Sequence, residues 1–405
     1  MKVFLVYYYY FNILILFLKN IEYSLLIFII IIIIYFPYFL YNFKIRLIPY
    51  ILSCEYKRIE EYLKKCSQSK YFHFAKKAIS SIPKISIISP VYNTGKFVLR
   101  LLRSIQNQNF NDIEIILIDD FSKDNSLELI TKYHSEDKRI IIIKNKRNMG
   151  TFASRVLGIL KSKGKYIIMP DSDDILLENS LKYFYLFSNK YDLELLRYNI
   201  YLNYGKTFFG EITKNLESGP IYQPKLSNYL FYAFGFLKQI DFNVSNKFII
   251  REALIRALNA LEKTELSMYM SGYEDGLLNY FLYRISKSLF FLKRFGYYYI
   301  KNNILNQEYK KGYLYNSIKC KFIYLIHVFN NSKNTKHEKD MTNELFKILI
   351  YNIGRAYLMS LIKRDSNFVI DINNILNADE FFEYKYKIFL NSTINSFFNK
   401  TIKII

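Results

Sequence analysis

Three carboxylates lie within four residues near the middle of the chain, in the Asp-Ser-Asp-Asp of residues 171–174, directly after the apolar residues 166–169. A β-branched apolar stretch bounded by Gly164 and Pro170 is typical of a buried central strand. Carboxylates this close together repel one another, and a divalent cation would relieve the repulsion. Oxygen ligands favour Mg²⁺ or Mn²⁺, ions that most often hold a substrate diphosphate. The alternative is a solvated acidic turn that caps the following helix.

The segments before this cluster repeat the order of apolar strand, polar turn and helix. The predicted strands are residues 85–89, 113–118 and 139–143, and the predicted helices include residues 97–105 and 150–160. Strands that alternate with helices predict an α/β fold with a mostly parallel, Rossmann-like sheet flanked by helices. Ligands bind at the carboxyl ends of such strands, so we expect Asn93, Asp120 and the acidic cluster to meet in one crevice.

Glycine-rich phosphate loops are absent from the sequence. No Gly-x-Gly-x-x-Gly follows the strand at residues 85–89, and there is no Walker motif. A metal site, rather than a glycine cradle, would therefore hold the phosphates. A nucleotidyltransferase would also use a metal ion to hold phosphates. Such an enzyme normally has a Gly-rich motif with a basic residue after the first strand, and residues 90–95 match that motif poorly.

The order and spacing of seven short motifs resemble the family-2 glycosyltransferases, which have the GT-A fold. The resemblance covers about residues 84–300. The motifs are Ser89-Pro90-Val91-Tyr92-Asn93, Ile118-Asp119-Asp120-Phe121-Ser122-Lys123-Asp124 (V-D-D-x-S-x-D), Asn148-Met149-Gly150 with Arg155, Asp171-Ser172-Asp173-Asp174 (D-x-D), Asn246-Lys247-Phe248 with Arg251, Gly272-Tyr273-Glu274-Asp275, and Tyr297-Tyr298-Tyr299.

This resemblance implies a binding site for a nucleotide-sugar donor. Asp120 would contact the nucleotide base or ribose, with Pro90 and Tyr92 shaping the base pocket beside Asn93. Arg155 would lie near the diphosphate. From the sequence alone, Arg155 reads equally well as a solvated helix residue.

The resemblance also implies a metal site and a catalytic base. Asp171 and Asp173 would form the D-x-D pair, and Asp173 or Asp174 would touch Mn²⁺ or Mg²⁺. Asp275 would deprotonate the acceptor hydroxyl, with Glu274 beside it. Inverting sugar transfer needs such a base opposite the leaving diphosphate, whose developing charge a metal stabilises. Without the family, Glu274 and Asp275 read as a helix N-terminus.

The absence of tryptophan narrows the subclass. A chain without Trp cannot contain the Q-x-x-R-W motif with which processive family-2 synthases hold their polymer. We therefore predict non-processive, inverting transfer of one sugar, from a uridine donor above all, to a glycan or glycolipid. A dolichyl-phosphate sugar synthase-like enzyme is one alternative, although its phosphate acceptor needs little help from a base. A catalytically silent GT-A module that binds nucleotide or glycan is another.

The amino terminus predicts a membrane anchor. Residues 23–41 are almost wholly apolar and long enough to cross a bilayer of about 30 Å, and residues 3–18 offer a shorter second span. Basic residues after the span place the catalytic domain in the cytosol by the positive-inside rule. Asn-x-Ser/Thr triplets such as that at Asn243 leave an ER or Golgi lumenal orientation open.

Net charge and cysteine content say less about the function than the motifs do. The formal charge of +22, from 57 Lys and Arg against 35 Asp and Glu, fits attraction to anionic membrane lipid or a lysine-rich codon bias. No nucleic-acid-binding module is recognisable, so no nucleic-acid partner is predicted. Three cysteines without ligand spacing predict neither a disulfide framework nor a zinc site. The sequence leaves the oligomeric state undetermined.

The predicted organisation has four parts. Residues 1–50 form the anchor, residues 51–83 a stem, residues 84–305 the GT-A domain and residues 306–405 a helical carboxyl-terminal region. The last part carries no readable motif.

Overall fold

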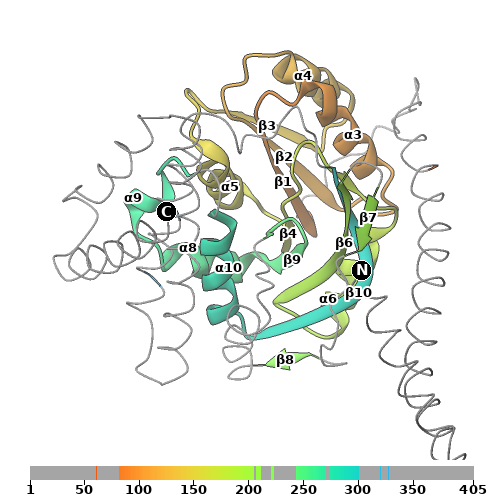
Figure 1. The fold of residues 1–405 in the computed structure, drawn as a ribbon, viewed down its shortest axis with the longest axis vertical. Coiled ribbons are helices and arrows are strands. Elements are labelled where there is room, and N and C mark those ends of the chain that lie inside the picture. The colour runs from red at the N-terminus through yellow and green to blue at the C-terminus, as the bar shows by residue number, and fades with distance from the viewer. Residues whose placement is uncertain are drawn as a thin grey trace, which may run out of the picture. The chain divides into compact units, whose positions relative to one another are not determined.

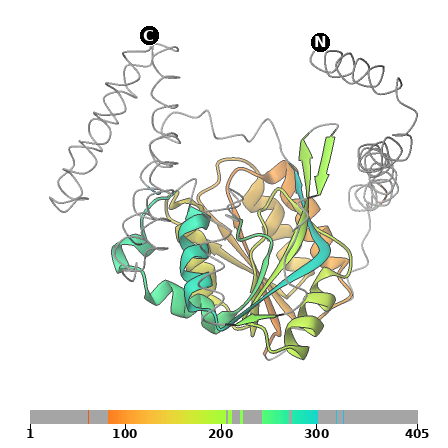
Figure 2. The ribbon, with the colours of Figure 1, turned by 60° about the horizontal axis from the view of Figure 1, so that its bottom comes forward.

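A computed structural model of the chain describes residues 61, 82–204, 207–210, 220–222, 243–270, 274–300, 320 and 327. The chain divides into two compact units, Met1–Phe72 and His73–Ile405, and every element given below belongs to the second. These elements form one sheet with helices against both of its faces (Figures 1 and 2). An α/β fold with helices flanking a sheet was predicted from the sequence.

One half of the sheet is parallel. Its strands lie in the order β3-β2-β1-β4 and are β1 (Ile85–Val91), β2 (Ile113–Asp119), β3 (Ile140–Lys144) and β4 (Tyr166–Ile168). The helices that connect them are α3 (Gly95–Gln106), α4 (Ser126–Glu136) and α5 (Gly150–Lys161). The predicted βαβ units are therefore confirmed here, and the carboxyl ends of β1, β2 and β4 meet at one edge.

The other half of the sheet is mixed, so the prediction of a mostly parallel sheet is wrong there. β9 (Lys247–Ile250) runs antiparallel to both β4 and β6 (Leu195–Tyr204). β10 (Ser288–Ile300) is parallel to β6 but antiparallel to β5 (Ile175–Leu176). Two short strands, β7 (Thr207–Gly210) and β8 (Ile221–Tyr222), pair at the margins. The strand–helix alternation on which the prediction rested does not extend to β9, so the direction of β9 could not be read from the sequence pattern.

Four more helices complete the described elements. They are α6 (Ser180–Lys190), α8 (Arg251–Asn259), α9 (Lys263–Leu266) and α10 (Glu274–Ile285).

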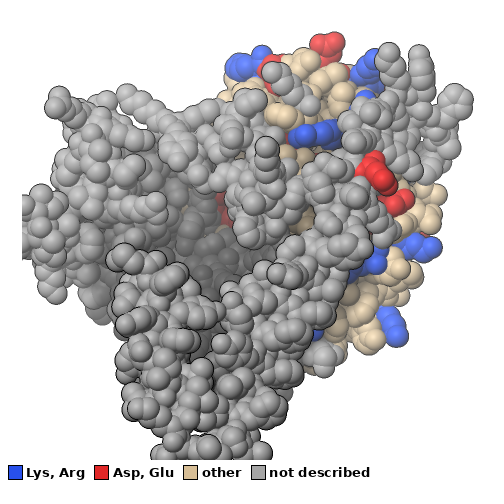
Figure 3. All heavy atoms as spheres, turned by 45° about the vertical axis from the view of Figure 1, so that its right-hand side comes forward, with Lys and Arg blue, Asp and Glu red and all other residues tan. Residues whose placement is uncertain are grey.

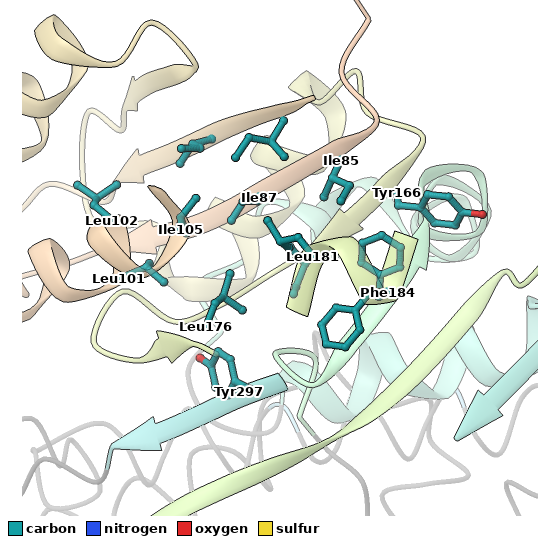
Figure 4. Packing of buried hydrophobic residues seen from close by; sticks show 14 of the residues in the cluster. Ile85, Ile87, Leu101, Leu102, Ile105, Tyr166, Leu176, Leu181, Phe184 and Tyr297 are labelled. Carbon is teal, nitrogen blue, oxygen red and sulfur yellow. The ribbon is translucent and has the colours of Figure 1, made fainter. Parts of the chain in front are cut away.

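Side chains on the two faces of the sheet alternate along each strand, and both faces are buried. Ile85 and Ile87 pack with Leu101 of α3 and Phe184 of α6 in one apolar cluster, which Figure 4 shows from close by. Burial of each such side chain stabilises the fold by about 1.5–3 kcal/mol. Burial on both faces explains why these strands are continuous apolar runs rather than alternating ones.

The opposite face packs against α5. Gly158 sits on Ile88 and Ile118, and a Cβ at Gly158 would lie 2.3 Å from Cγ2 of Ile88. Glycine at this position therefore lets α5 approach the sheet closely, which places the side chains at the start of α5 beside the strand ends.

The predicted anchor (residues 1–50) and carboxyl-terminal region (residues 306–405) fall almost entirely outside the described residues, as does most of the predicted stem. Among the helices that the structure describes, none has the length and apolarity to span a bilayer. On the face drawn in Figure 3, the described Lys and Arg side chains are scattered among Asp and Glu rather than gathered in one patch.

Candidate active site

The turns that follow β1 and β2 are tied to each other by hydrogen bonds. The Asn93 side chain accepts a hydrogen bond from the Lys123 backbone N–H at 2.7 Å, and the Asn93 N–H donates to Oγ of Ser122 at 3.2 Å. Asn93 has a φ of 54° and Phe121 a φ of 67°, so both turns use the left-handed region. Asn93 thus lies where the sequence placed it, at the carboxyl edge of the sheet.

The acidic loop after β4 joins the same edge. Oγ1 of Thr94 donates to Oγ of Ser172 at 3.0 Å, and Arg100 of α3 donates to the backbone carbonyl of Asp173 at 3.1 Å. The predicted meeting of the β1 turn, the β2 turn and the acidic cluster is therefore present in the fold. Asp171 and Asp173 are partly buried, whereas Ser172 is buried.

Asp120 is buried and faces the amino terminus of α5. Its carboxylate accepts hydrogen bonds from the backbone N–H groups of Met149 at 2.7 Å and Gly150 at 2.8 Å, and from Nδ2 of Asn145 at 2.8 Å. A helix amino terminus favours a carboxylate through its unpaired N–H groups and its dipole. Asp120 therefore fixes the start of α5; its predicted contact with a base or ribose stays a prediction.

Pro90 and Tyr92 flank the end of β1. Pro90 is paired in register with Ile118, two residues before Asp120, and both Pro90 and Tyr92 are partly buried. They lie at the same edge as Asp120, as a base pocket would require.

Arg155 links two motifs that are far apart in the sequence. Its Nη2 lies 2.6 Å from Oδ1 of Asp171, and its Nη1 forms an ion pair with Oδ1 of Asp275. The Arg155 side chain is only 4% exposed, so this reading replaces that of a solvated helix residue. Burial alone would lower the pKa of Arg155, but the charges of Asp275 and Asp171 outweigh burial and raise it. One buried cation thus joins the acidic loop to the start of α10.

Two carboxyl groups near Arg155, those of Asp171 and Glu274, have raised pKa values. Burial raises the pKa of Asp171 to about 6 even though Arg155 opposes the shift. Burial, and then the negative charge of Asp275, raises the pKa of Glu274 to about 7. Titratable groups with perturbed pKa values are concentrated at functional sites, and a base with a pKa near 7 is well suited to proton transfer.

The segment before β9 holds the second carboxylate oxygen of Asp275. Oδ2 accepts a hydrogen bond from the Val244 N–H at 3.1 Å. This segment is held by the fully buried Lys247, whose Nζ donates to Oδ1 of Asn246 at 3.0 Å and to the carbonyl of Asn243. The Asn246-Lys247 element therefore acts on Asp275 through the backbone.

Asp174 differs from its neighbours in the acidic loop. It is fully buried, and its two oxygens accept hydrogen bonds from the Tyr297 hydroxyl at 2.6 Å and the Ile300 N–H at 2.8 Å. The same hydroxyl accepts one from the Asp171 N–H at 2.9 Å. Burial raises the pKa of Asp174 well above its usual range. Asp174 and Tyr297 thus fasten the loop to β10, a role that no local sequence signal gave to Tyr297.

Asp171 and Asp173 fit a Mg²⁺ or Mn²⁺ site in which substrate phosphates supply further ligands. Asp171 and Asp173 supply hard oxygen donors at the sheet edge, and Mg²⁺ is usually bound by one or two carboxylates together with substrate phosphates. Within the described ranges, no group of three His, Cys, Asp or Glu side chains is placed to hold a metal ion.

Part of the chain is similar in sequence to known proteins. The family model "Glycosyl transferase family 2" matches residues 86–258. The glycosyltransferase GlyG of Streptococcus pneumoniae is 36% identical over 123 residues, which are 30% of this chain and 40% of GlyG. The poly(ribitol-phosphate) beta-glucosyltransferase of Bacillus spizizenii is 38% identical over 117 residues, 28% of this chain and 18% of that enzyme. The chain thus spans less than half the length of these curated relatives.

Solved structures share the fold. The structure of S. aureus TarS in complex with UDP-GlcNAc has a TM-score of 0.51 and 18% identity, covering 65% of this chain and 71% of that one. Another TarS structure has a TM-score of 0.53 and 19% identity, covering 72% and 79%. Residues 86–258 are thus similar to glycosyl transferase family 2, which agrees with the motifs and with the fold.

Proposed function

We propose that this protein is an inverting glycosyltransferase that moves one sugar from a nucleotide-diphosphate donor, a UDP-sugar, to a hydroxyl of a glycan or glycolipid. The observation that carries the proposal is the bridge through Arg155, which unites Asp171 of the D-x-D loop with Asp275, the expected base. Arg155 thereby holds Asp171 and Asp275 close to each other, which supports a role for both in one reaction. The UDP-GlcNAc complex of S. aureus TarS, which shares the fold, supports a uridine donor.

The donor would lie across the carboxyl ends of β1, β2 and β4. Tyr92 and Pro90 would border the base, with Asn93 and Asp120 beside the nucleoside. Asp171 and Asp173 would hold Mn²⁺ or Mg²⁺ against the diphosphate. The ion would supply charge stabilisation to the leaving group. Asp174 is left out of this set, because both of its oxygens are engaged by Tyr297 and Ile300.

Asp275 would take the proton from the acceptor hydroxyl. The acceptor oxygen then forms a bond to the anomeric carbon as the bond from that carbon to the diphosphate breaks, and the nucleoside diphosphate departs. Asp275 is 21% exposed, and hydrogen bonds from Arg155 and Val244 fix its orientation. Such fixed orientation supports efficient general-base catalysis. Glu274, with its pKa raised to about 7, is the adjacent carboxylate that can hold a proton at neutral pH.

We further propose that the chain acts at a membrane, anchored through residues 23–41 with the catalytic domain in the cytosol; anionic lipid headgroups would then be partners. The basic residues that follow the predicted span support this orientation. Protease protection in sealed membrane vesicles tests it, because a lumenal domain would resist digestion until detergent is added.

Calorimetric titration of the purified full-length chain tests the donor. UDP, GDP and a panel of their sugars are compared with and without Mn²⁺. Manganese-dependent binding of a uridine nucleotide is expected, and transfer of its sugar would then exclude a silent binding module. Turnover with a lipid phosphate rather than a hydroxyl acceptor would favour the dolichyl-phosphate type of enzyme. Absence of binding to every nucleotide would refute the proposal.

A further inference from the structure

Phe121 has a backbone conformation that its side chain disfavours. Four non-glycine residues in the described ranges have positive φ values, and three of them are the short polar residues Asn93, Asn179 and Asp192. Asn and Asp tolerate the left-handed region, but a bulky residue there is an outlier. Phe121, at φ 67°, is that outlier. Strained residues of this kind cluster at functional sites, where the surrounding structure holds them in place.

Burial of the ring in the core does not offset the strain. Phe121 is 41% exposed, so its ring is not a core side chain. The turn around it is held by other atoms: Ser122 accepts from the Asn93 N–H at 3.2 Å, and the Lys123 N–H donates to the Asn93 side chain at 2.7 Å. These bonds fix the backbone and leave the ring at the surface.

The exposed ring lies at the edge of the candidate donor site. Phe121 directly follows Asp120, whose carboxylate is fixed at the start of α5 by Met149 and Gly150. The ammonium group of Lys123 sits 3.5 Å from the centre of the ring, so one face of the ring carries a cation. The rest of the ring is a flat apolar surface of the type on which a nucleobase stacks.

We propose that Phe121 is a donor-binding residue whose ring stacks on the nucleobase. This inference rests on the proposed function and deepens it, because it names the part of the donor that Phe121 recognises. Base stacking explains why an exposed aromatic residue with a strained backbone lies directly beside Asp120.

The test compares Phe121→Gly with the matched variant Asn179→Gly. Both place glycine at a left-handed position, but Asn179 caps α6 and is not part of the candidate site. Each full-length variant is melted, then titrated with UDP, GDP and inorganic pyrophosphate in the presence of Mn²⁺. Phe121→Leu is added, because it keeps an apolar side chain without the aromatic face.

We expect Phe121→Gly to raise Tm by about 2–4 °C through relief of strain. We expect its affinity for the bound nucleotide to fall roughly tenfold, the effect of losing one stacked base, while pyrophosphate affinity stays unchanged. Phe121→Leu should show most of the loss, and Asn179→Gly none. Wild-type nucleotide affinity in Phe121→Gly, or an equal loss for pyrophosphate, would overturn the stacking role and leave the proposed function standing. Failure of the wild type to bind either nucleotide would overturn both.

Discussion

Arg155 forms an ion pair with Asp275 across 120 residues of sequence, and the same guanidinium lies 2.6 Å from Asp171. The D-x-D loop and the start of α10 therefore share one buried counter-charge. Removing it would leave two carboxylates close together without compensation, which ties the stability of the domain to the geometry of the site.

Replacement of Arg155 by Met should destabilise the fold strongly. Loss of one partner from a buried ion pair leaves uncompensated charge and costs about 3–5 kcal/mol, which urea denaturation measures. The matched control is Lys84→Met, which breaks the exposed pair with Asp112 (2.8 Å) and should leave the denaturation midpoint unchanged. Equal midpoints for the two variants would mean that Arg155 is not the counter-charge that holds the site.

Asp173→Asn should abolish metal-dependent donor binding and turnover together while the fold is retained. The amide keeps the size of the side chain but loses the charge that a divalent ion needs. Calorimetry with the donor and Mn²⁺ measures the effect, and circular dichroism confirms the fold. Full activity in this variant would remove Asp173 from the metal site.

Tyr297→Phe should weaken the attachment of the acidic loop to β10. The variant loses the hydrogen bonds to Asp174 (2.6 Å) and from the Asp171 N–H (2.9 Å), at a cost of about 1–3 kcal/mol in the free energy of unfolding. Tyr183→Phe serves as control, because Tyr183 is exposed on α6. If both variants unfold at the same urea concentration, the Tyr297 hydroxyl does not support the loop.

Asp275→Asn should lower turnover by roughly 10² to 10⁴ with nucleotide affinity nearly unchanged, as loss of a general base does. The measurement pairs steady-state kinetics with calorimetric binding of the nucleotide. Glu274→Gln in parallel shows whether the neighbouring carboxylate shares the task. Normal turnover at saturation, with binding lost, would contradict the role of Asp275 as base.

Glu274 should make stability depend on pH. Its folded pKa of about 7 exceeds its ordinary value, so the folded state binds a proton that the unfolded state releases between about pH 4.5 and 7. The stabilising contribution is fully present below the lower pKa and is lost as pH rises through 7. Because Gln mimics the protonated carboxyl, the free energy of unfolding of the wild type should fall relative to that of Glu274→Gln over this range, by at most about 1.4 kcal/mol per pH unit in urea denaturation. Parallel curves would contradict the raised pKa.

The two halves of the sheet were not equally predictable. The apolar runs at β1, β2 and β4 and the helices between them could be read directly, because a buried parallel strand leaves a continuous apolar signature and βαβ connections fix its direction. The direction of β9 could not be read in this way, because the strand–helix alternation does not extend to β9. Its antiparallel direction follows from packing between β4 and β6.

The sequence by itself determined the resemblance to the family, the strand–helix order of the parallel half and which carboxylates are candidates, because those depend on residue spacing within short segments. Only the tertiary structure decided that Arg155 joins Asp171 to Asp275, that Asp174 is fastened to Tyr297 rather than grouped with Asp173, and that Phe121 stands strained and exposed. These relationships join residues brought together by long-range packing. A carboxylate's role depends on its burial and its hydrogen-bond donors, and both come from segments distant in the chain.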